Sequence, residues 1–274
     1  NRTLARFGIE TSFYDPSAGA AIADLMRPNT RVVYVESPGS LTFEIQDIPA
    51  IAAAAHGRGA LVIMDNTWAT PLYFKAFHHG VDVIVHAATK YIVGHADAML
   101  GLIVCRDEHY RTIKGTAHGL GYAAAPDDCY LALRGLRTLS VRLARHQENA
   151  LAVARWLQGR PEVERVLHPA LPEHPDHALW QRDFTGATGL FSIVLKPCAT
   201  EALAAMLDGL TLFGMGVSWG GYESLVLRVK PETVRTATRW QAAGPTLRLH
   251  IGLEDPRDLI ADLERGFERL NATT

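Results

Sequence analysis

Residues 60–97 read ALVIMDNTWATPLYFKAFHHGVDVIVHAATKYIVGHAD, and this stretch decides the fold. Two short, almost continuously apolar runs, 60–64 and 81–85, flank a short segment of helical composition, 72–80. Such runs are typical of strands in a parallel sheet that is covered on both faces, so the stretch predicts a strand–helix–strand unit. The carboxyl ends of the two strands should then lie on one edge of the sheet, with the polar residues that follow them close together.

The same pattern continues on both sides of this unit. Residues 31–35 and 101–105 predict two more strands, and residues 47–59 predict a helix with Pro49 in its first turn. This alternation of apolar strands with helices predicts an α/β domain with a mainly parallel sheet, which we assign to residues 1–136.

The second half of the chain, residues 137–274, has a mixed pattern that predicts a smaller α+β domain. The predicted elements are a long helix broken near Gly135, a strand, a helix and a strand, over residues 127–159, 188–195, 200–209 and 246–251. A last helix begins at Pro256, after Asp255 as its N-cap. Strict alternation in the strand 246–251 predicts that it is half-buried, with Arg248 and His250 together on its polar face.

The composition is that of an ordinary globular chain and excludes several classes of protein. Of the 274 residues, 48% are hydrophobic and 20% are charged, which excludes extensive disorder. The 27 Lys and Arg residues nearly balance the 29 Asp and Glu residues, so a general nucleic-acid-binding protein is not expected. No run approaches about 18 consecutive apolar residues, so no membrane-spanning helix is predicted.

Neither a disulfide framework nor a metal centre is predicted. The chain has three widely separated cysteines, Cys105, Cys129 and Cys198. This usage is typical of a protein in the reducing cytoplasm. His168, His174 and His177 lie in a proline-rich stretch, which we interpret as an exposed loop rather than a metal site.

Asp65 and Lys90 follow the two strands of the central unit and should face one crevice. A structural salt bridge between them is one interpretation, and the residues alone leave it open. The other is a reactive lysine, because partial burial lowers the pKa of an amine and makes it a usable nucleophile or Schiff-base former. Arg248 is likewise either a surface charge or a bidentate partner for a carboxylate.

The motifs around these residues occur together in a known family. Asp65-Asn-Thr-Trp and Ala87-Ala-Thr-Lys-Tyr-Ile-Val-Gly-His-Ala-Asp97 closely resemble the Cys/Met-metabolism family of pyridoxal-phosphate enzymes, and within it the bacterial cystathionine β-lyases. Further matching motifs follow in order: Glu36-Ser-Pro-Gly-Ser40, Arg134-Gly-Leu-Arg-Thr-Leu139, Arg182-Asp-Phe-Thr-Gly186, Ser218-Trp-Gly-Gly-Tyr-Glu-Ser224 and Leu247-Arg-Leu-His-Ile-Gly-Leu-Glu-Asp255. The resemblance covers nearly the whole chain and implies an aminotransferase-like domain of fold type I.

The resemblance implies a cofactor site for pyridoxal phosphate. Lys90 would form a Schiff base with it and, once freed, remove the Cα proton of the substrate. Asp65 would pair with the protonated pyridine nitrogen, Thr89 would donate a hydrogen bond to the phosphate, and Ser218 would help to orient the lysine. Family members also have a portion before the start of this chain that holds most of the phosphate, so the first part of the cofactor domain is expected to be missing here.

The resemblance also implies a substrate and an assembly. Arg248 would bind the α-carboxylate of an amino-acid substrate, with Ser218 and Trp219 beside it. The expected reaction, a step of transsulfuration and methionine biosynthesis, is β-elimination from L-cystathionine to homocysteine, pyruvate and ammonia. Val217 stands where the β-lyase pattern has Tyr, so the exact substrate is left open. A γ-acting family member is the first alternative, and a truncated, non-catalytic module is the second. Homotetramers with sites between subunits are expected, and nucleic acid and membranes are not.

Overall fold

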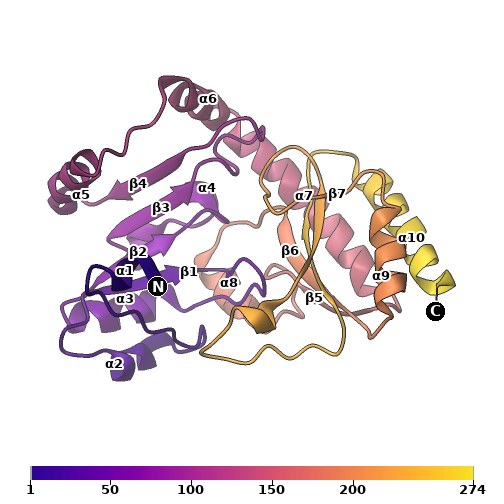
Figure 1. Ribbon diagram of the computed structural model, residues 1–274, viewed down its shortest axis with the longest axis horizontal. Helices are drawn as coiled ribbons and strands as arrows, with labels where there is room; N and C mark the ends of the chain where they lie inside the picture. The colour runs from indigo at the N-terminus through magenta and orange to yellow at the C-terminus, as the bar shows by residue number, and fades with distance from the viewer. Residues whose placement is uncertain (1, 274) are drawn as a thin grey trace.

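The computed structural model describes residues 2–273, which form two sheets with helices packed against each (Figure 1). The first sheet has the order β1-β2-β3-β4, over Val32–Glu36, Leu61–Asp65, Val83–Ala87 and Gly101–Cys105. The second has the order β5-β6-β9-β8-β7, over Val163–Leu167, Leu190–Leu195, Thr246–His250, Leu225–Val229 and Gly214–Met215. The predicted α/β class with a mainly parallel first sheet is confirmed.

The first three strands of the first sheet are parallel, and β4 is antiparallel to β3. The strand β3 starts at Val83, slightly later than predicted. The direction reverses at β4 because residues 88–100 turn back directly, whereas a parallel strand would need a longer crossover, usually with a helix. This reversal places Lys90 in a turn just beyond the carboxyl end of β3.

The helix α3 (Ile48–Gly57) covers one face of the first sheet, and Asp47 caps its N-terminus by accepting a hydrogen bond from the Ala50 amide at 3.2 Å. The opposite face is open in the described part of the chain, where Tyr34 is 52% and Ile103 is 55% exposed. Burial on both faces, which the apolar strands predicted, is therefore not observed for residues 2–273. An apolar strand is no proof of burial, because apolar atoms make up much of any protein surface.

The helices α7 (Leu139–Gln158), α9 (Thr200–Asp208) and α10 (Pro256–Ala272) pack on one side of the second sheet (Figure 1). The strand β9 lies between β6 and β8 and is buried along its whole length. The prediction that it is half-buried is wrong: Arg248 is 8% and His250 is 1% exposed. Its polar face is turned inward, toward the loop that precedes β8.

The predicted domain boundary at residue 136 falls between α6 (Pro126–Leu136) and α7, with one sheet on each side. A shared hydrophobic cluster nevertheless crosses this boundary. The Trp68 ring packs edge-on against Phe184, with ring centroids 6.1 Å apart, and Trp68 Nε1 donates to the Leu190 carbonyl at 2.9 Å. The division into 1–136 and 137–274 stays a prediction.

The other helical segments are α1 (Arg2–Ala5), η1 (Gly19–Ala21), α2 (Ile22–Leu25), α4 (Thr70–Tyr73), η2 (Ala76–His79), α5 (Asp107–Gly119), α8 (His177–Asp183) and η3 (Pro231–Thr233). In the described part of the chain, every helix is too short or too polar to span a membrane. Residues 168–176 form a loop, as predicted, but the prediction that it is exposed is wrong for His168 and His174, because both side chains are buried and His168 packs against Phe191 of β6. Residues 2–273 contain no group of three or more His, Cys, Asp or Glu side chains that could hold a metal ion.

Candidate active site

Lys90 lies in a tight turn after β3, and the buried side chain of Arg142 holds this turn in place. The Gly94 amide donates to the Lys90 carbonyl at 2.8 Å and closes the turn. The Arg142 guanidinium donates to the Tyr91 carbonyl at 2.7 Å and to the Gly135 carbonyl at 2.8 Å. It occupies the space that a Cβ at Gly94 would need, so the turn and the start of α7 are packed as one unit.

The loop Val217–Gly221 meets Lys90 from the other half of the chain. Lys90 Nζ donates a hydrogen bond to Ser218 Oγ at 2.6 Å and lies 5.3 Å from the centre of the Trp219 ring. At that distance the ring face attracts the cationic form of the amine. The structure therefore brings together three of the predicted site residues from distant parts of the sequence.

Arg248 reaches the same place from β9. Its guanidinium donates to the Val217 carbonyl, at the start of the loop. Burial, together with the nearby positive charge of Arg248, lowers the pKa of Lys90 below its ordinary value. The neutral amine, which is the nucleophilic and basic form, is thus more abundant at a given pH than in an exposed lysine.

Asp65 ends β2 and is in register with Val85 of β3, so its carboxylate lies on the same sheet edge as the turn that holds Lys90. The Thr67 amide donates to Asp65 Oδ1 at 2.9 Å, and the Ala87 amide donates to Thr67 Oγ1 at 2.9 Å. These two bonds orient the carboxylate and join the ends of the strands. No ion pair links Asp65 to Lys90 or to any other described residue, so the simple salt-bridge interpretation is not observed.

The charge of Asp65 acts on its neighbours in the sheet. Glu36 of β1 is in register with Asp65, and desolvation together with this neighbouring charge raises the pKa of Glu36. Desolvation and the same charge raise the pKa of Tyr34 to about 12. A cationic group beside Asp65 would relieve this repulsion.

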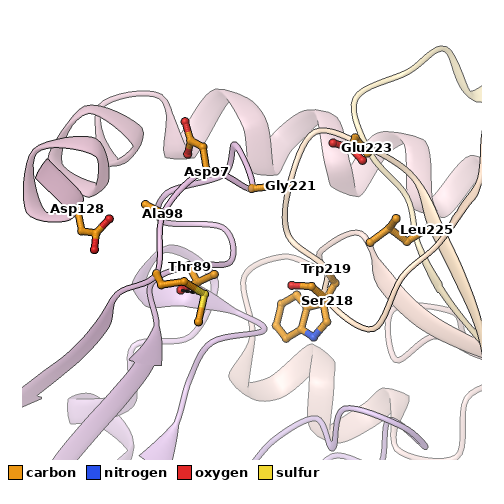
Figure 2. Close-up of a pocket in the computed structure, with 11 residues that line it drawn as sticks. Thr89, Asp97, Ala98, Asp128, Ser218, Trp219, Gly221, Glu223 and Leu225 are labelled. Carbon is orange, nitrogen blue, oxygen red and sulfur yellow. Dashed lines mark hydrogen bonds between the residues drawn. The ribbon is translucent and has the colours of Figure 1, made fainter. Parts of the chain in front are cut away.

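A cavity of about 580 Å³ opens between the turn and the loop. Figure 2 shows Thr89, Ala98 and Asp97 on one side of it, with Ser218, Trp219 and Leu225 on the other. The Thr89 hydroxyl accepts a hydrogen bond from the Leu100 amide at 2.9 Å. The volume of the cavity is that of a typical small-molecule site.

Comparison with known proteins gives this site a family. The family model described as Cys/Met metabolism PLP-dependent enzyme matches residues 1–268. The chain belongs to this family. A Rhizobium johnstonii protein provisionally named a cystathionine beta-lyase is 53% identical, over 98% of this chain and 69% of its own length. Cystathionine beta-lyase of Escherichia coli is 48% identical, over 98% of this chain and 70% of its own length.

A solved structure agrees with this assignment. Cystathionine gamma synthase from Xanthomonas oryzae pv. oryzae, in complex with aminoacrylate and cysteine, superposes with a TM-score of 0.91. The two sequences are 36% identical, and the superposition covers 100% of this chain and 72% of the gamma synthase chain. The likeness extends over both sheets, so the aminotransferase-like fold expected from the motifs is confirmed.

The residues at this edge fit pyridoxal phosphate, the cofactor of the family. Lys90 offers an amine with a lowered pKa to the aldehyde group. Asp65 offers to the ring nitrogen a carboxylate that is oriented by the Thr67 amide. Thr89 lines the cavity, and its proposed bond to the phosphate stays a prediction.

Sequence reasoning missed two residues that support the site. Thr67 orients Asp65, and His250 contacts the loop that carries Ser218. Asp65 itself was a usable signal, because an Asp side chain often accepts a hydrogen bond from the backbone amide two residues on. His250 was placed on the polar face of its strand, but the pattern could not tell a site-facing surface from a solvent-facing one.

Proposed function

We propose that this chain carries a pyridoxal-phosphate-dependent carbon–sulfur lyase activity that cleaves L-cystathionine to homocysteine, pyruvate and ammonia. The observation that carries the proposal is a lysine amine with a lowered pKa, hydrogen-bonded to Ser218 and close to a buried arginine. The names of the relatives from Rhizobium johnstonii and Escherichia coli support the choice of reaction.

Bound pyridoxal phosphate would supply an electron sink that acidifies the Cα–H bond of an amino acid attached to it. Asp65 would keep a proton on the ring nitrogen, because its carboxylate is held in place by the Thr67 amide. Lys90 Nζ would accept the Cα proton, since burial keeps more of the amine in its basic form. The Cβ–S bond would then break, the sulfur would keep the bonding electron pair and take up a proton to leave as homocysteine, and water would hydrolyse the three-carbon remainder to pyruvate and ammonia.

Arg248 would bind the α-carboxylate of the substrate. Its hydrogen bond to the Val217 carbonyl uses one N–H of the guanidinium and leaves other N–H donors for a bidentate grip. Trp219 would cover the reacting atoms and exclude water, and Ser218 Oγ would aim the Lys90 amine at Cα. A group held in this way reacts faster because its orientation is already fixed.

Product analysis tests the reaction. The 274-residue chain is loaded with pyridoxal phosphate, incubated with L-cystathionine, and the oxo acids and thiols are separated by chromatography. Pyruvate with homocysteine supports β-elimination, whereas 2-oxobutyrate with cysteine supports the γ-acting alternative. The structural likeness to a gamma synthase is the observation that favours this alternative. A preparation that binds the cofactor but forms neither product would point to a non-catalytic module. The Lys90→Ala variant is the control and should form no product.

We also propose a homotetramer in a reducing, cytoplasmic compartment. Exposed apolar side chains on α6 and the start of α7, Tyr130, Leu133 and Val141, support an interface between copies. The free thiols Cys105, Cys129 and Cys198 support a reducing environment. Light scattering of the purified chain and of Leu133→Asp tests the assembly: the native chain should have four times the monomer mass, and the variant a smaller mass.

A further inference from the structure

The loop Val217–Gly221 is anchored to β9 on both sides of Ser218. Arg248 donates to the Val217 carbonyl at one end. At the other end, His250 Nε2 lies 3.2 Å from the Gly220 amide nitrogen and 3.0 Å from the Gly221 carbonyl oxygen. Both side chains leave the same face of β9, because residues two apart in a strand share a face.

Gly220 transmits this anchor to Lys90. It has a φ of +88°, and a Cβ added there would lie 2.9 Å from the Lys90 Cα. The loop backbone therefore rests directly on the backbone of the lysine. Any shift of Gly220 changes the position of Ser218 Oγ relative to Lys90 Nζ, which are 2.6 Å apart.

The surroundings of His250 favour the neutral form of its imidazole ring. Burial, with the positive charges of its neighbours, lowers its pKa to about 3. A neutral imidazole carries one proton, so Nε2 either accepts from the Gly220 amide or donates to the Gly221 carbonyl, according to the tautomer. In both tautomers the bond from Nε2 goes to the loop.

We propose that His250 is a positioning residue for Lys90: through Nε2 it fixes Gly220 and Gly221, and so holds Ser218 Oγ against the lysine amine. The proposal rests on the proposed function only in taking Lys90 as the reacting amine. It assigns His250 no contact with substrate or cofactor.

Three variants separate this role from simple packing. The amide of His250→Gln reaches the position of Nε2, the amide of His250→Asn reaches only that of Nδ1, and His250→Leu fills the space without a polar atom. The readout is the pKa of Lys90 in the chain freed of pyridoxal phosphate. It is measured as the pH dependence of acetylation by acetic anhydride, with the Lys90 peptide quantified by mass spectrometry.

We expect His250→Leu and His250→Asn to raise the pKa of Lys90 by about half a unit or more, because the loop withdraws and water reaches the amine. His250→Gln should restore the native value. His146→Asn is the matched control. His146 belongs to the same buried ring cluster, with its ring centre 5.2 Å from that of His250, but it bonds through Nδ1 to the Ile251 carbonyl and not to the loop. Its variant should leave the pKa of Lys90 unchanged.

The proposal is overturned if a folded His250→Leu chain keeps the native pKa of Lys90, if His250→Gln behaves like His250→Asn, or if His146→Asn shifts the pKa as much. Folding is checked by a cooperative thermal transition, and if the leucine variant does not fold, the Gln and Asn pair decides alone. The readout needs no turnover of L-cystathionine. Failure of the proposed reaction and failure of this positioning role are therefore seen in different experiments.

Discussion

Gly220→Ala is the change that most directly tests how the loop is placed on Lys90. Gly220 has a φ of +88°, where an L-residue other than glycine loses about 1–2 kcal/mol. The new Cβ would lie 2.8 Å from the Lys90 Cβ and 2.9 Å from the Lys90 Cα. Because carbon atoms prefer a separation of about 3.5–4.0 Å, the loop must move by roughly 0.6–1 Å.

That movement is large compared with the contact it disturbs. The Lys90 Nζ to Ser218 Oγ distance is 2.6 Å, and lengthening it by this amount takes the pair to the limit of a hydrogen bond. A misplacement of about 1 Å in a catalytic group slows a reaction about 100-fold. We therefore expect kcat/KM for pyruvate release to fall about 10- to 100-fold, with a loss of about 1–3 kcal/mol in the free energy of unfolding.

The assay compares Gly220→Ala with Gly221→Ala in steady-state turnover of L-cystathionine and in thermal unfolding. Gly221 is the matched control, because a Cβ there would lie 3.4 Å from the Ala96 Cβ, an ordinary contact. A Gly220→Ala chain within about twofold of the Gly221→Ala chain in kcat/KM would refute the reasoning, since a 1 Å shift should slow the reaction far more.

Three further predictions concern the substrate arginine, the lysine amine and the packing between the two sheets. Arg248→Lys should raise KM for L-cystathionine about 10- to 100-fold with a smaller fall in kcat, because lysine cannot bind a carboxylate bidentately. A fall in kcat as large as the rise in KM would contradict this prediction. The rate at which the cofactor-free chain binds pyridoxal phosphate, followed by absorbance, should rise about tenfold per pH unit and then level off, with a midpoint below the pKa of an ordinary lysine. The reason is that only the neutral amine reacts and burial lowers the pKa of Lys90. A midpoint at the ordinary lysine pKa would contradict this prediction. Trp68→Phe should lower the free energy of unfolding by about 1–3 kcal/mol in a single transition, since it removes the bond to the Leu190 carbonyl; two separate transitions would indicate independent domains.

The shared location of Asp65 and Lys90 was predictable because it depends on strand ends. Asp65 and Lys90 follow two neighbouring parallel strands, and the carboxyl ends of such strands share one edge. The reversal at β4 could not be predicted from its apolar residues, since Gly101–Cys105 has the same composition in either direction. Direction is set by the connection, and residues 88–100 turn back without a crossover helix.

Burial of polar side chains was harder to predict. His168 and His174 lie among prolines and read as a loop at the surface, yet both are buried. The His168 ring packs against Phe191, and the Ala170 amide donates to His168 Nδ1 at 3.2 Å. His168 is buried because its ring packs and Nδ1 accepts a backbone hydrogen bond, although Nε2 has no partner among the described residues, and a sequence shows none of these conditions.

The inward polar face of β9 explains why the site depends on this strand. Burying a charged or polar side chain without partners costs several kcal/mol, and the loop supplies backbone partners for the Arg248 guanidinium and for Nε2 of His250. The loop in turn has no regular secondary structure over residues 217–221, and those two side chains anchor it to β9. Each therefore requires the other: a β9 with leucine at both positions would pack well and leave Ser218 unplaced. The alternating polar residues of a central strand are thus better read as a surface that faces a site than as a surface that faces water.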